Sequence, residues 1–362
     1  MDRLADSVLP LIRTRADLHR WSAANAHGRQ MHDAVDLLEA AIPTTGPAEM
    51  YAVTHKALAS AITVNARADD SSGIIGDACR RLLDLHPGVA AAAHVPPGRL
   101  AEWMIKFQFD GEVDYFAIDP VAYAPALGTA GIAAYRERLT AIEARLPPAP
   151  VADRWVSSHD QFILDWNARR LAVYDHDIDG IIATHARDRR VAAWLEDTAK
   201  AFDEIGDIDL AVEWAKQAAD FDRGHQALKA AGYWCELLAR HQPTDVVPTR
   251  LELFRRWPSS STAADLHHDS GLTWPDYQDE VLATLATSPR DAVLFALLTL
   301  DDVRRAWDLA HSLGLESDDV WERLVADYQV LDPVATLPIL ARLVDQDLTR
   351  TGAQHYRSAA GP

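Results

Sequence analysis

The stretch from Trp194 to Phe221, WLEDTAKAFDEIGDIDLAVEWAKQAADF, constrains the fold more than any other part of this chain. Its pattern predicts two short helices joined by a tight turn. The positions at which a helical hairpin needs small, large or turn-forming residues are filled in order by Ala199, Phe202, Gly206, Ala211, Ala215 and Ala218. Neither helix of such a hairpin can bury its apolar face alone, so hairpins of this kind stack into α-solenoids, most of which bind other molecules.

The composition extends this prediction to the whole chain. Its 362 residues suffice for one large or two ordinary domains, and 48% of them are hydrophobic, which is enough for a real core. Alanine and leucine are frequent whereas isoleucine and threonine are sparse, a bias that favours helix over sheet. Two further helical hairpins are predicted at residues 225–257 and 318–348, the last with Asp332 and Pro333 at the start of its second helix.

Prolines mark the main break in the helical pattern. The segment Leu146-Pro147-Pro148-Ala149-Pro150 predicts a stiff, extended linker. We therefore expect an N-terminal helical domain at residues 1–146 and a helical repeat domain at residues 151–362. Within the first domain, one helix is expected over 74–85, ending before Pro87, and another over 129–145 after a single turn at 120–123. Residues 177–184 either continue the helix before them or start a new one.

Two resemblances refine the fold class. The hairpin at 194–221 resembles a tetratricopeptide repeat (TPR), whose small, aromatic, glycine and alanine positions it matches without the usual terminal proline. The chain as a whole resembles the helical region of bacterial, mainly actinobacterial, proteins associated with the SWIM zinc-finger family, through its segments 69–77, 100–128 and 302–360. The SWIM module itself is absent, so this resemblance implies no zinc site. Together the patterns predict an all-α fold, an α-α superhelix of TPR-like hairpins with an N-terminal helical bundle.

Charge and cysteine content narrow the class of partner. A formal charge of −19 disfavours nucleic acid, because such a chain repels phosphate groups. No apolar run approaches the roughly 18 residues of a membrane span, so no membrane association is expected. The two cysteines, Cys79 and Cys235, form no C-x-x-C pair, which excludes a disulfide framework and a thiolate zinc site. We therefore expect a cytoplasmic location.

The sequence contains no recognisable catalytic or cofactor motif. Asp175, Asp177 and Asp179 followed by Gly180 imitate the start of a calcium loop, but Ala186 stands where an EF-hand needs a bidentate Glu. The closely spaced histidine pairs lack the i, i+4 spacing of paired helical metal ligands, and no glycine-rich phosphate loop or nucleophile elbow occurs. The sequence therefore predicts no metal, no cofactor and no catalytic residue, and it leans away from an enzyme.

The first helix of the 194–221 hairpin carries a binding signal. In the register of such repeats, five of its residues face the concave surface: Glu196, Asp197, Lys200, Asp203 and Glu204. TPR proteins that grip a C-terminal carboxylate use Lys, Asn and Arg on that surface, whereas this face is mainly acidic. We therefore expect a protein or peptide partner to be basic or neutral there, the alternative being a merely solvated face.

These patterns predict a cytoplasmic scaffold or adaptor that binds a protein or peptide partner through a TPR-like groove. Two alternatives stay open. One is an enzyme or small-molecule receptor with a pocket between the two helical halves. The other is an acidic inhibitor or nucleic-acid mimic that occupies a basic site on another protein. Convergent polar groups in a closed pocket would favour the first alternative, and one acidic face with phosphate-like spacings would favour the second.

Overall fold

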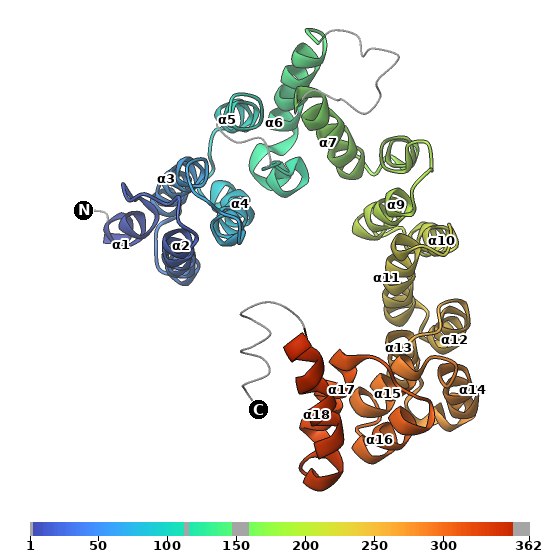
Figure 1. Ribbon diagram of the computed structural model, residues 1–362. Coiled ribbons are helices and arrows are strands. Elements are labelled where there is room, and N and C mark those ends of the chain that lie inside the picture. The colour runs from blue at the N-terminus through green and yellow to red at the C-terminus, as the bar shows by residue number, and fades with distance from the viewer. Residues whose placement is uncertain (1–2, 112–115, 147–158, 350–362) are drawn as a thin grey trace. The chain divides into compact units, whose positions relative to one another are not determined.

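The computed structural model describes residues 3–111, 116–146 and 159–349 (Figure 1). The chain folds into helices joined by short connections, and these described residues contain no β-strand, so the predicted all-α class is confirmed. The chain divides into two compact units, Met1–Arg187 with Glu204–Gly206 and Asp188–Asp203 with Asp207–Pro362. The domain boundary drawn from the sequence stays a prediction, and its prolines at 147, 148 and 150 lie outside the described residues.

Two apolar clusters hold the first unit together. Its described helices are α1 (Arg3–Ile12), α2 (Trp21–Ala41), α3 (Pro47–Asn65), α4 (Ile74–Ala92), α5 (Pro97–Phe109), α6 (Pro120–Glu143), α7 (His159–Tyr174), α8 (Ile178–Ile181) and the π-helix η1 (Ile182–Ala186). Helices α1 to α4 pack around Met31, Leu38 and Leu58. Helices α4 to α7 contribute to a second cluster that contains Leu100 and Tyr135. This second cluster fixes α6 and α7 against each other.

Helix α4 corrects the prediction that it ends before Pro87. It continues to Ala92, although Pro87 has no N–H to donate to the preceding turn. His86 is fully buried one residue earlier, where it contacts His55, and Val89 and Ala90 are buried in the core beyond the proline. Tertiary packing of these side chains therefore outweighs the local cost of the proline, which sequence patterns alone do not reveal.

Helix α6 is also longer than the predicted single turn at 120–123. Helical backbone begins at Pro120 and is interrupted at Gly128, where φ is 57° and ψ is −178°. A second helical part then runs to Glu143, in agreement with the helix expected from residue 129. Glycine adopts this backbone conformation readily because it has no Cβ, so Gly128 forms the kink. Asp119 caps the first part by accepting a hydrogen bond from the backbone N–H of Val121.

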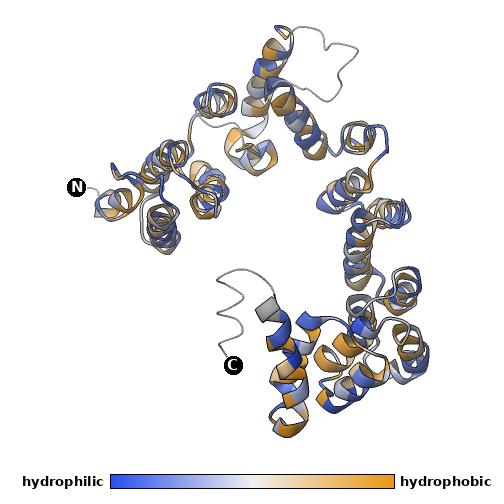
Figure 2. Cartoon of the chain, viewed as in Figure 1, coloured by the Kyte–Doolittle hydropathy of each residue, from blue (hydrophilic) through white to orange (hydrophobic). Residues whose placement is uncertain are grey.

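The second unit is built from consecutive helices joined by short connections. Its described helices are α9 (Ala192–Glu204), α10 (Ile208–Ala219), α11 (His225–His241), η2 (Pro243–Asp245), α12 (Val246–Arg256), α13 (Ser260–Ser270), η3 (Gly271–Thr273), α14 (Pro275–Leu285), α15 (Pro289–Leu298), α16 (Val303–Ser312), α17 (Asp318–Tyr328) and α18 (Pro333–Thr349). From α10 onward, helices that are close in the chain pack together, such as α10 with α11, α15 with α16 and α17 with α18. Orange and blue faces alternate around many of these helices in Figure 2, as expected for amphipathic helices.

The structure has a pair of consecutive helices at each of the three positions where a hairpin is predicted. The first consists of α9 and α10, with Gly206 in the turn at φ 79° and the Asp207 carboxylate accepting a hydrogen bond from the Leu210 N–H. Its small and aromatic positions are fully buried: Ala199, Phe202, Ala211, Ala215 and Ala218. The second hairpin consists of α11 and α12, and the third of α17 and α18. In the third, Asp332 accepts hydrogen bonds from the first turn of α18, as the sequence predicts.

Candidate functional site

The structure pairs much of the acidic face on α9 with cations of the chain itself. Glu196 is buried, and its carboxylate lies 2.5 Å from Lys200 Nζ and 3.9 Å from Lys229 Nζ. Asp197 and Lys200 are exposed. A buried and paired carboxylate cannot act as an open anionic contact, so Glu196 supports the packing of α9 in addition to any role in binding.

Asp203 and Glu204 are likewise engaged in ion pairs. Asp203 accepts hydrogen bonds from the Tyr233 hydroxyl at 3.0 Å and from Arg240 Nη2 at 2.8 Å. Burial opposes ionisation of Asp203, but the hydrogen bonds from Arg240 and Tyr233 outweigh it and lower the pKa of the carboxyl. Glu204 accepts hydrogen bonds from the Arg170 guanidinium at 2.6 and 2.7 Å. These pairs neutralise much of the charge on which the predicted site rests.

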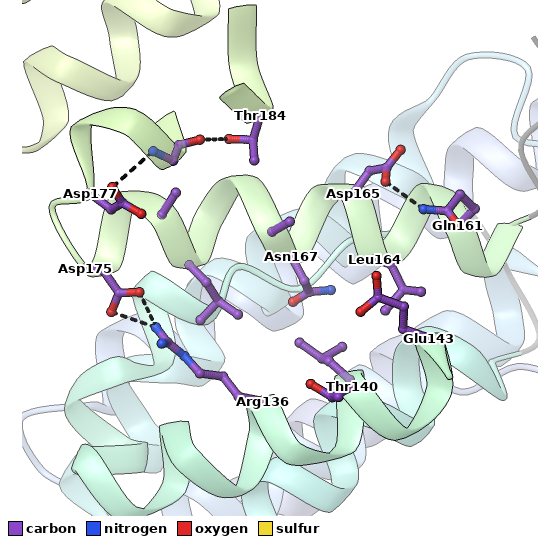
Figure 3. Close-up of a pocket in the computed structure, with 15 residues that line it drawn as sticks. Arg136, Thr140, Glu143, Gln161, Leu164, Asp165, Asn167, Asp175, Asp177 and Thr184 are labelled. Carbon is purple, nitrogen blue, oxygen red and sulfur yellow. Dashed lines mark hydrogen bonds and ion pairs between the residues drawn. The ribbon is translucent and has the colours of Figure 1, made fainter. Parts of the chain in front are cut away.

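A groove in the first unit has a different character. It lies between α6, α7 and α8, and has a volume of about 440 Å³ (Figure 3). Aliphatic side chains form its apolar part: Leu139, Leu164, Ala168, Leu171 and Ala172. Charged and polar side chains complete the lining: Arg136, Thr140, Glu143, Gln161, Asp165, Asn167, Asp175, Asp177 and Thr184. We call this feature the α6–α7 groove.

One ion pair joins the two main walls of the α6–α7 groove. Arg136 on α6 donates from Nη2 to both carboxylate oxygens of Asp175, which follows the end of α7, at 2.6 Å each (Figure 3). Glu143, Asp165 and Asp175 are exposed, and Asp177 is too. Four carboxylates therefore line the groove beside a single guanidinium, which makes the lining net acidic.

A buried hydrogen-bond network fixes α6 and α7 beneath the α6–α7 groove. The Tyr135 hydroxyl donates to Asn167 Oδ1 at 2.7 Å and accepts from Gln108 Nε2 at 2.6 Å. Asn167 Nδ2 also donates to the Ile163 carbonyl at 2.8 Å. All three polar side chains are buried, so the network holds the walls in one arrangement before any ligand arrives.

Asp175 and Asp177 of the calcium-like motif line this groove. Asp175 pairs with Arg136, whereas Asp177 caps the short helix α8 by accepting a hydrogen bond from the Gly180 N–H at 3.0 Å. His176 between them has a positive φ of 54° and follows the end of α7 at Tyr174. Helix α8 starts anew at Ile178, so of the two predicted possibilities for 177–184 the structure shows a new helix. Within the described residues, no cluster of three His, Cys, Asp or Glu side chains is placed to bind a metal ion.

A second polar cluster lies elsewhere in the first unit. His86 Nε2 is 2.9 Å from His55 Nδ1, and His86 Nδ1 is 2.8 Å from the Tyr123 hydroxyl. Tyr51 and Trp103 pack against both imidazoles. Burial, and to a lesser degree the charge of His55, lowers the pKa of His86 to about 3. His86 is therefore neutral at physiological pH, and its two ring nitrogens are both engaged.

The side-chain types of the α6–α7 groove indicate what kind of ligand would suit it. Its described lining contains carboxylates, amides, hydroxyls and one guanidinium, but no histidine, cysteine or lysine. An apolar floor flanked by carboxylates suits a ligand that is both apolar and cationic.

Sequence reasoning missed this groove, although its signal is present. On α7 the lining residues recur at helical spacing from Gln161 through Asp165 to Ala172, and on α6 from Arg136 to Glu143. Each face mixes leucines with charges. Within a single helix, such a face predicts only that the helix packs half-buried. The groove forms where the faces of two helices lie beside each other, which the pattern of one helix cannot show.

The model of a family of unknown function, DUF6880, matches residues 8–361. The chain belongs to this family. The DUF6880 match covers every residue that lines the α6–α7 groove and every helix of both units except the first residues of α1. No curated protein matches the chain. Among the described residues, no helix has the length and apolar character needed to cross a bilayer.

Proposed function

We propose that this DUF6880 protein is a scaffold or adaptor that binds a protein partner, and that the α6–α7 groove takes up a basic, amphipathic segment of that partner. One observation carries this proposal: an apolar floor lies beside four carboxylates and one guanidinium. Apolar side chains of a bound segment would be buried on the floor. Lysines and arginines at its edges would face Glu143 and Asp165.

The arrangement of the second unit supports the same class of function. Its successive hairpins pack on their neighbours, which is the order of packing in TPR-like solenoids. We propose that the unit is such a solenoid and that its surface extends the binding area. The basic partner, the concave-face role of Glu196, Asp197, Lys200, Asp203 and Glu204, the cytoplasmic location and the resemblance to SWIM-associated proteins stay predictions.

The volume of the α6–α7 groove keeps a small-molecule receptor as a second candidate. About 440 Å³ lies within the range of small-ligand sites, roughly 300–1,000 Å³. The same lining would then favour a small organic cation. A polyamine such as spermidine is a suitable probe, because it is flexible, cationic and partly apolar.

The test uses a labelled amphipathic peptide of leucine and lysine, with a leucine and glutamate peptide of the same length as the ligand control. Fluorescence anisotropy measures binding to the full chain. The double variant Glu143→Lys with Asp165→Lys is expected to weaken binding of the lysine peptide at least tenfold, or about 1.4 kcal/mol, because two attractions become repulsions. Ala168→Phe, which adds a ring to the exposed floor, is expected to weaken it without changing the charge.

The matched control is the double variant Asp33→Lys with Glu236→Lys, which makes the same change of charge at exposed helical positions that do not line the groove. An equal loss in this control would assign the binding to the overall charge of the chain and contradict the proposal. Saturable thermal stabilisation by spermidine, lost in the groove variant while the lysine peptide fails to bind, would instead favour the receptor.

A further inference from the structure

A second pocket of the first unit is lined by cations and hydroxyl groups, and its described lining contains no carboxylate. It has a volume of about 350 Å³ and lies between the end of α1 and one face of α3, two helices that pack against each other (Figure 1). We call it the α1–α3 pocket. Its charged and hydroxyl side chains are Arg13, Thr14, Lys56, Ser60, Thr63 and Arg67.

The local sequence explains why these side chains meet. Lys56, Ser60 and Thr63 recur at intervals of four and three residues, so they lie on one face of α3. Arg13 directly follows the last residue of α1, and Arg67 lies in the turn after α3. Because α1 packs on α3, the two arginines and the lysine converge on one polar surface.

Two hydrogen bonds hold the arginines across the α1–α3 pocket. Arg13 Nε donates to Ser60 Oγ on α3 at 3.0 Å, and Arg67 Nη2 donates to the backbone carbonyl of Thr14. Both acceptors are neutral, so these bonds position the guanidinium groups without cancelling their charge. Within the described residues, neither arginine pairs with a carboxylate, and Lys56 forms no hydrogen bond or ion pair.

This lack of a carboxylate partner sets the α1–α3 pocket apart from other cations of the first unit. Arg81 lies 2.7 Å from Asp36, and Arg170 lies 2.8 Å from Asp119. The chain has 54 acidic and 35 basic residues, so acidic partners are abundant. Three neighbouring cations that pair with none of them in the described part of the chain form a local positive site on an otherwise acidic protein, which favours an anionic ligand.

The charge of the α1–α3 pocket matches that of a phosphate group. The C-terminal ends of α1 and α3 each contribute about half a negative charge, because their last carbonyl groups are unpaired within the helix. Set against three cations, the two helix ends leave an excess of about two positive charges. A phosphate monoester carries about −1.5 to −2 charges at pH 7, whereas a carboxylate carries only one. The planar guanidinium group also donates to two phosphate oxygens at once.

Two hydroxyl groups supply further donors. Ser60 Oγ accepts from Arg13 Nε, and Thr14 Oγ1 accepts from the Ala16 N–H at 3.0 Å. Within the described residues, neither hydroxyl donates its own proton to another group of the chain. Each O–H is therefore available to a ligand that only accepts hydrogen bonds, as a fully ionised phosphate does.

We propose that the α1–α3 pocket binds a small phosphorylated ligand, whose phosphate group contacts Arg13, Lys56 and Arg67. The volume falls in the lower part of the range for small-ligand sites, roughly 300–1,000 Å³. A long polyanion such as nucleic acid would extend beyond the pocket and meet the negative field of a chain with a formal charge of −19, whereas a small ligand stays among the cations. This inference depends neither on the α6–α7 groove nor on the proposed function.

Isothermal titration calorimetry of the full chain with inorganic pyrophosphate tests the proposal, at physiological salt and without divalent cations. The wild-type chain is expected to bind pyrophosphate saturably at one site. The double variant Arg13→Gln with Arg67→Gln is expected to weaken binding at least tenfold, because two charge-assisted contacts are lost. Lys56→Gln removes one charge without touching either positioning hydrogen bond, so it tests the site in a chain whose thermal unfolding should be unchanged. It is expected to weaken binding at least threefold.

The matched control is the double variant Arg29→Gln with Arg99→Gln, which removes two exposed cations of the first unit that do not line the α1–α3 pocket. Its pyrophosphate affinity should equal that of the wild type. An equal loss in the control, or no saturable binding to the wild-type chain, would overturn the proposal. Tighter binding of an oligothymidine strand, or binding only to vesicles that contain phosphatidic acid, would also overturn it, if Lys56→Gln weakens that binding. The pocket would then be assigned to a nucleic acid or to a lipid headgroup.

Discussion

His55 Nδ1 and His86 Nε2 lie 2.9 Å apart, so a single proton is shared along the line between the two imidazoles. If both rings were fully protonated, two N–H groups would point at each other across this distance. The Tyr123 hydroxyl engages the remaining ring nitrogen of His86. The buried cluster therefore favours the neutral form of the His86 imidazole over its protonated form.

This relationship predicts acid sensitivity. The pKa of His86 is lowered from its ordinary value of 6.5 to about 3, first by burial and then by the charge of His55. Because the folded-state pKa is the lower one, the unfolded chain takes up a proton as the pH falls below 6.5 while the folded chain does not. The free energy of unfolding is therefore expected to fall by about 1.4 kcal/mol per pH unit for this group between roughly pH 6 and pH 3.

Urea unfolding at several pH values between 7.5 and 4.5 measures this slope. Other groups contribute to it, among them His185, whose pKa burial lowers to about 4. The variant His86→Gln keeps a hydrogen-bonding side chain and removes the titration. Its unfolding free energy should therefore fall less steeply with decreasing pH than that of the wild type, by up to about 1.4 kcal/mol per pH unit, which corresponds to one proton. Parallel slopes for the two chains would contradict the assignment to His86.

A second prediction concerns two glycines with opposite roles. Gly206 has φ 79° in the turn of the α9–α10 hairpin, whereas Gly232 lies inside α11, where an added Cβ meets no atom within 4 Å. Gly206→Ala is expected to lower the free energy of unfolding by about 1–2 kcal/mol, because an L-residue is strained at this φ. Gly232→Ala is expected to raise it by about 0.5–1 kcal/mol, because alanine loses less entropy in a helix. Chemical denaturation measures the unfolding free energy of both variants. Changes of the same sign in the two variants would show that the backbone conformation of the glycine does not decide the effect.

The network beneath the α6–α7 groove gives a third prediction. Tyr135→Phe removes one hydroxyl that joins Asn167 to Gln108 and leaves two buried polar groups with fewer partners. The expected loss is about 1–3 kcal/mol of unfolding free energy. Tyr277→Phe, in the second unit, makes the same chemical change at a half-buried position and serves as the control, for which a smaller loss is expected. If the network also preorganises the groove, Tyr135→Phe should weaken binding of the leucine and lysine peptide at a temperature where the chain remains folded.

Local patterns predicted the hairpins because their determinants are local. Gly206 breaks the helix, Asp207 and Asp332 cap the next one, and Ala211 permits close packing, so each effect lies within a few residues of its cause. The continuation of α4 through Pro87 depends instead on burial of His86 against side chains from other helices. No property of residues 84–90 alone contains that information.

The site was less predictable for the same reason. The α6–α7 groove joins Arg136 to Asp175 across 39 positions of sequence, and the charge of Glu204 depends on Arg170, 34 positions away. Asp197 is exposed, but the repeat register could not show that Glu196 is buried against Lys200. The charge that a helix presents at the protein surface can be assigned only when the ion pairs of its side chains with residues distant in sequence are known.

Arg170 provides the last prediction. Its guanidinium donates to Asp119 and to Glu204, and only 14% of its side chain is exposed. Although burial opposes it, the hydrogen bonds that the guanidinium donates to these two carboxylates raise the pKa of Arg170 above its ordinary value. Arg170→Met would leave both carboxylates without this cation and would weaken the cap that Asp119 provides for α6. We expect a loss of about 2–3 kcal/mol in unfolding free energy, within the range for a partly buried pair.

Arg99→Met is the matched control, because Arg99 is exposed in the first turn of α5, and its loss should stay within about 0.5 kcal/mol. Equal effects of the two substitutions would show that Arg170 acts only as a surface charge. The result also decides how Glu204 variants are interpreted. If Arg170→Met destabilises the chain as expected, a Glu204→Lys variant that loses a partner must first be shown to be folded, since the substitution places a second cation beside Arg170. Binding by the α9 face is then measured at a temperature well below the unfolding midpoint of that variant.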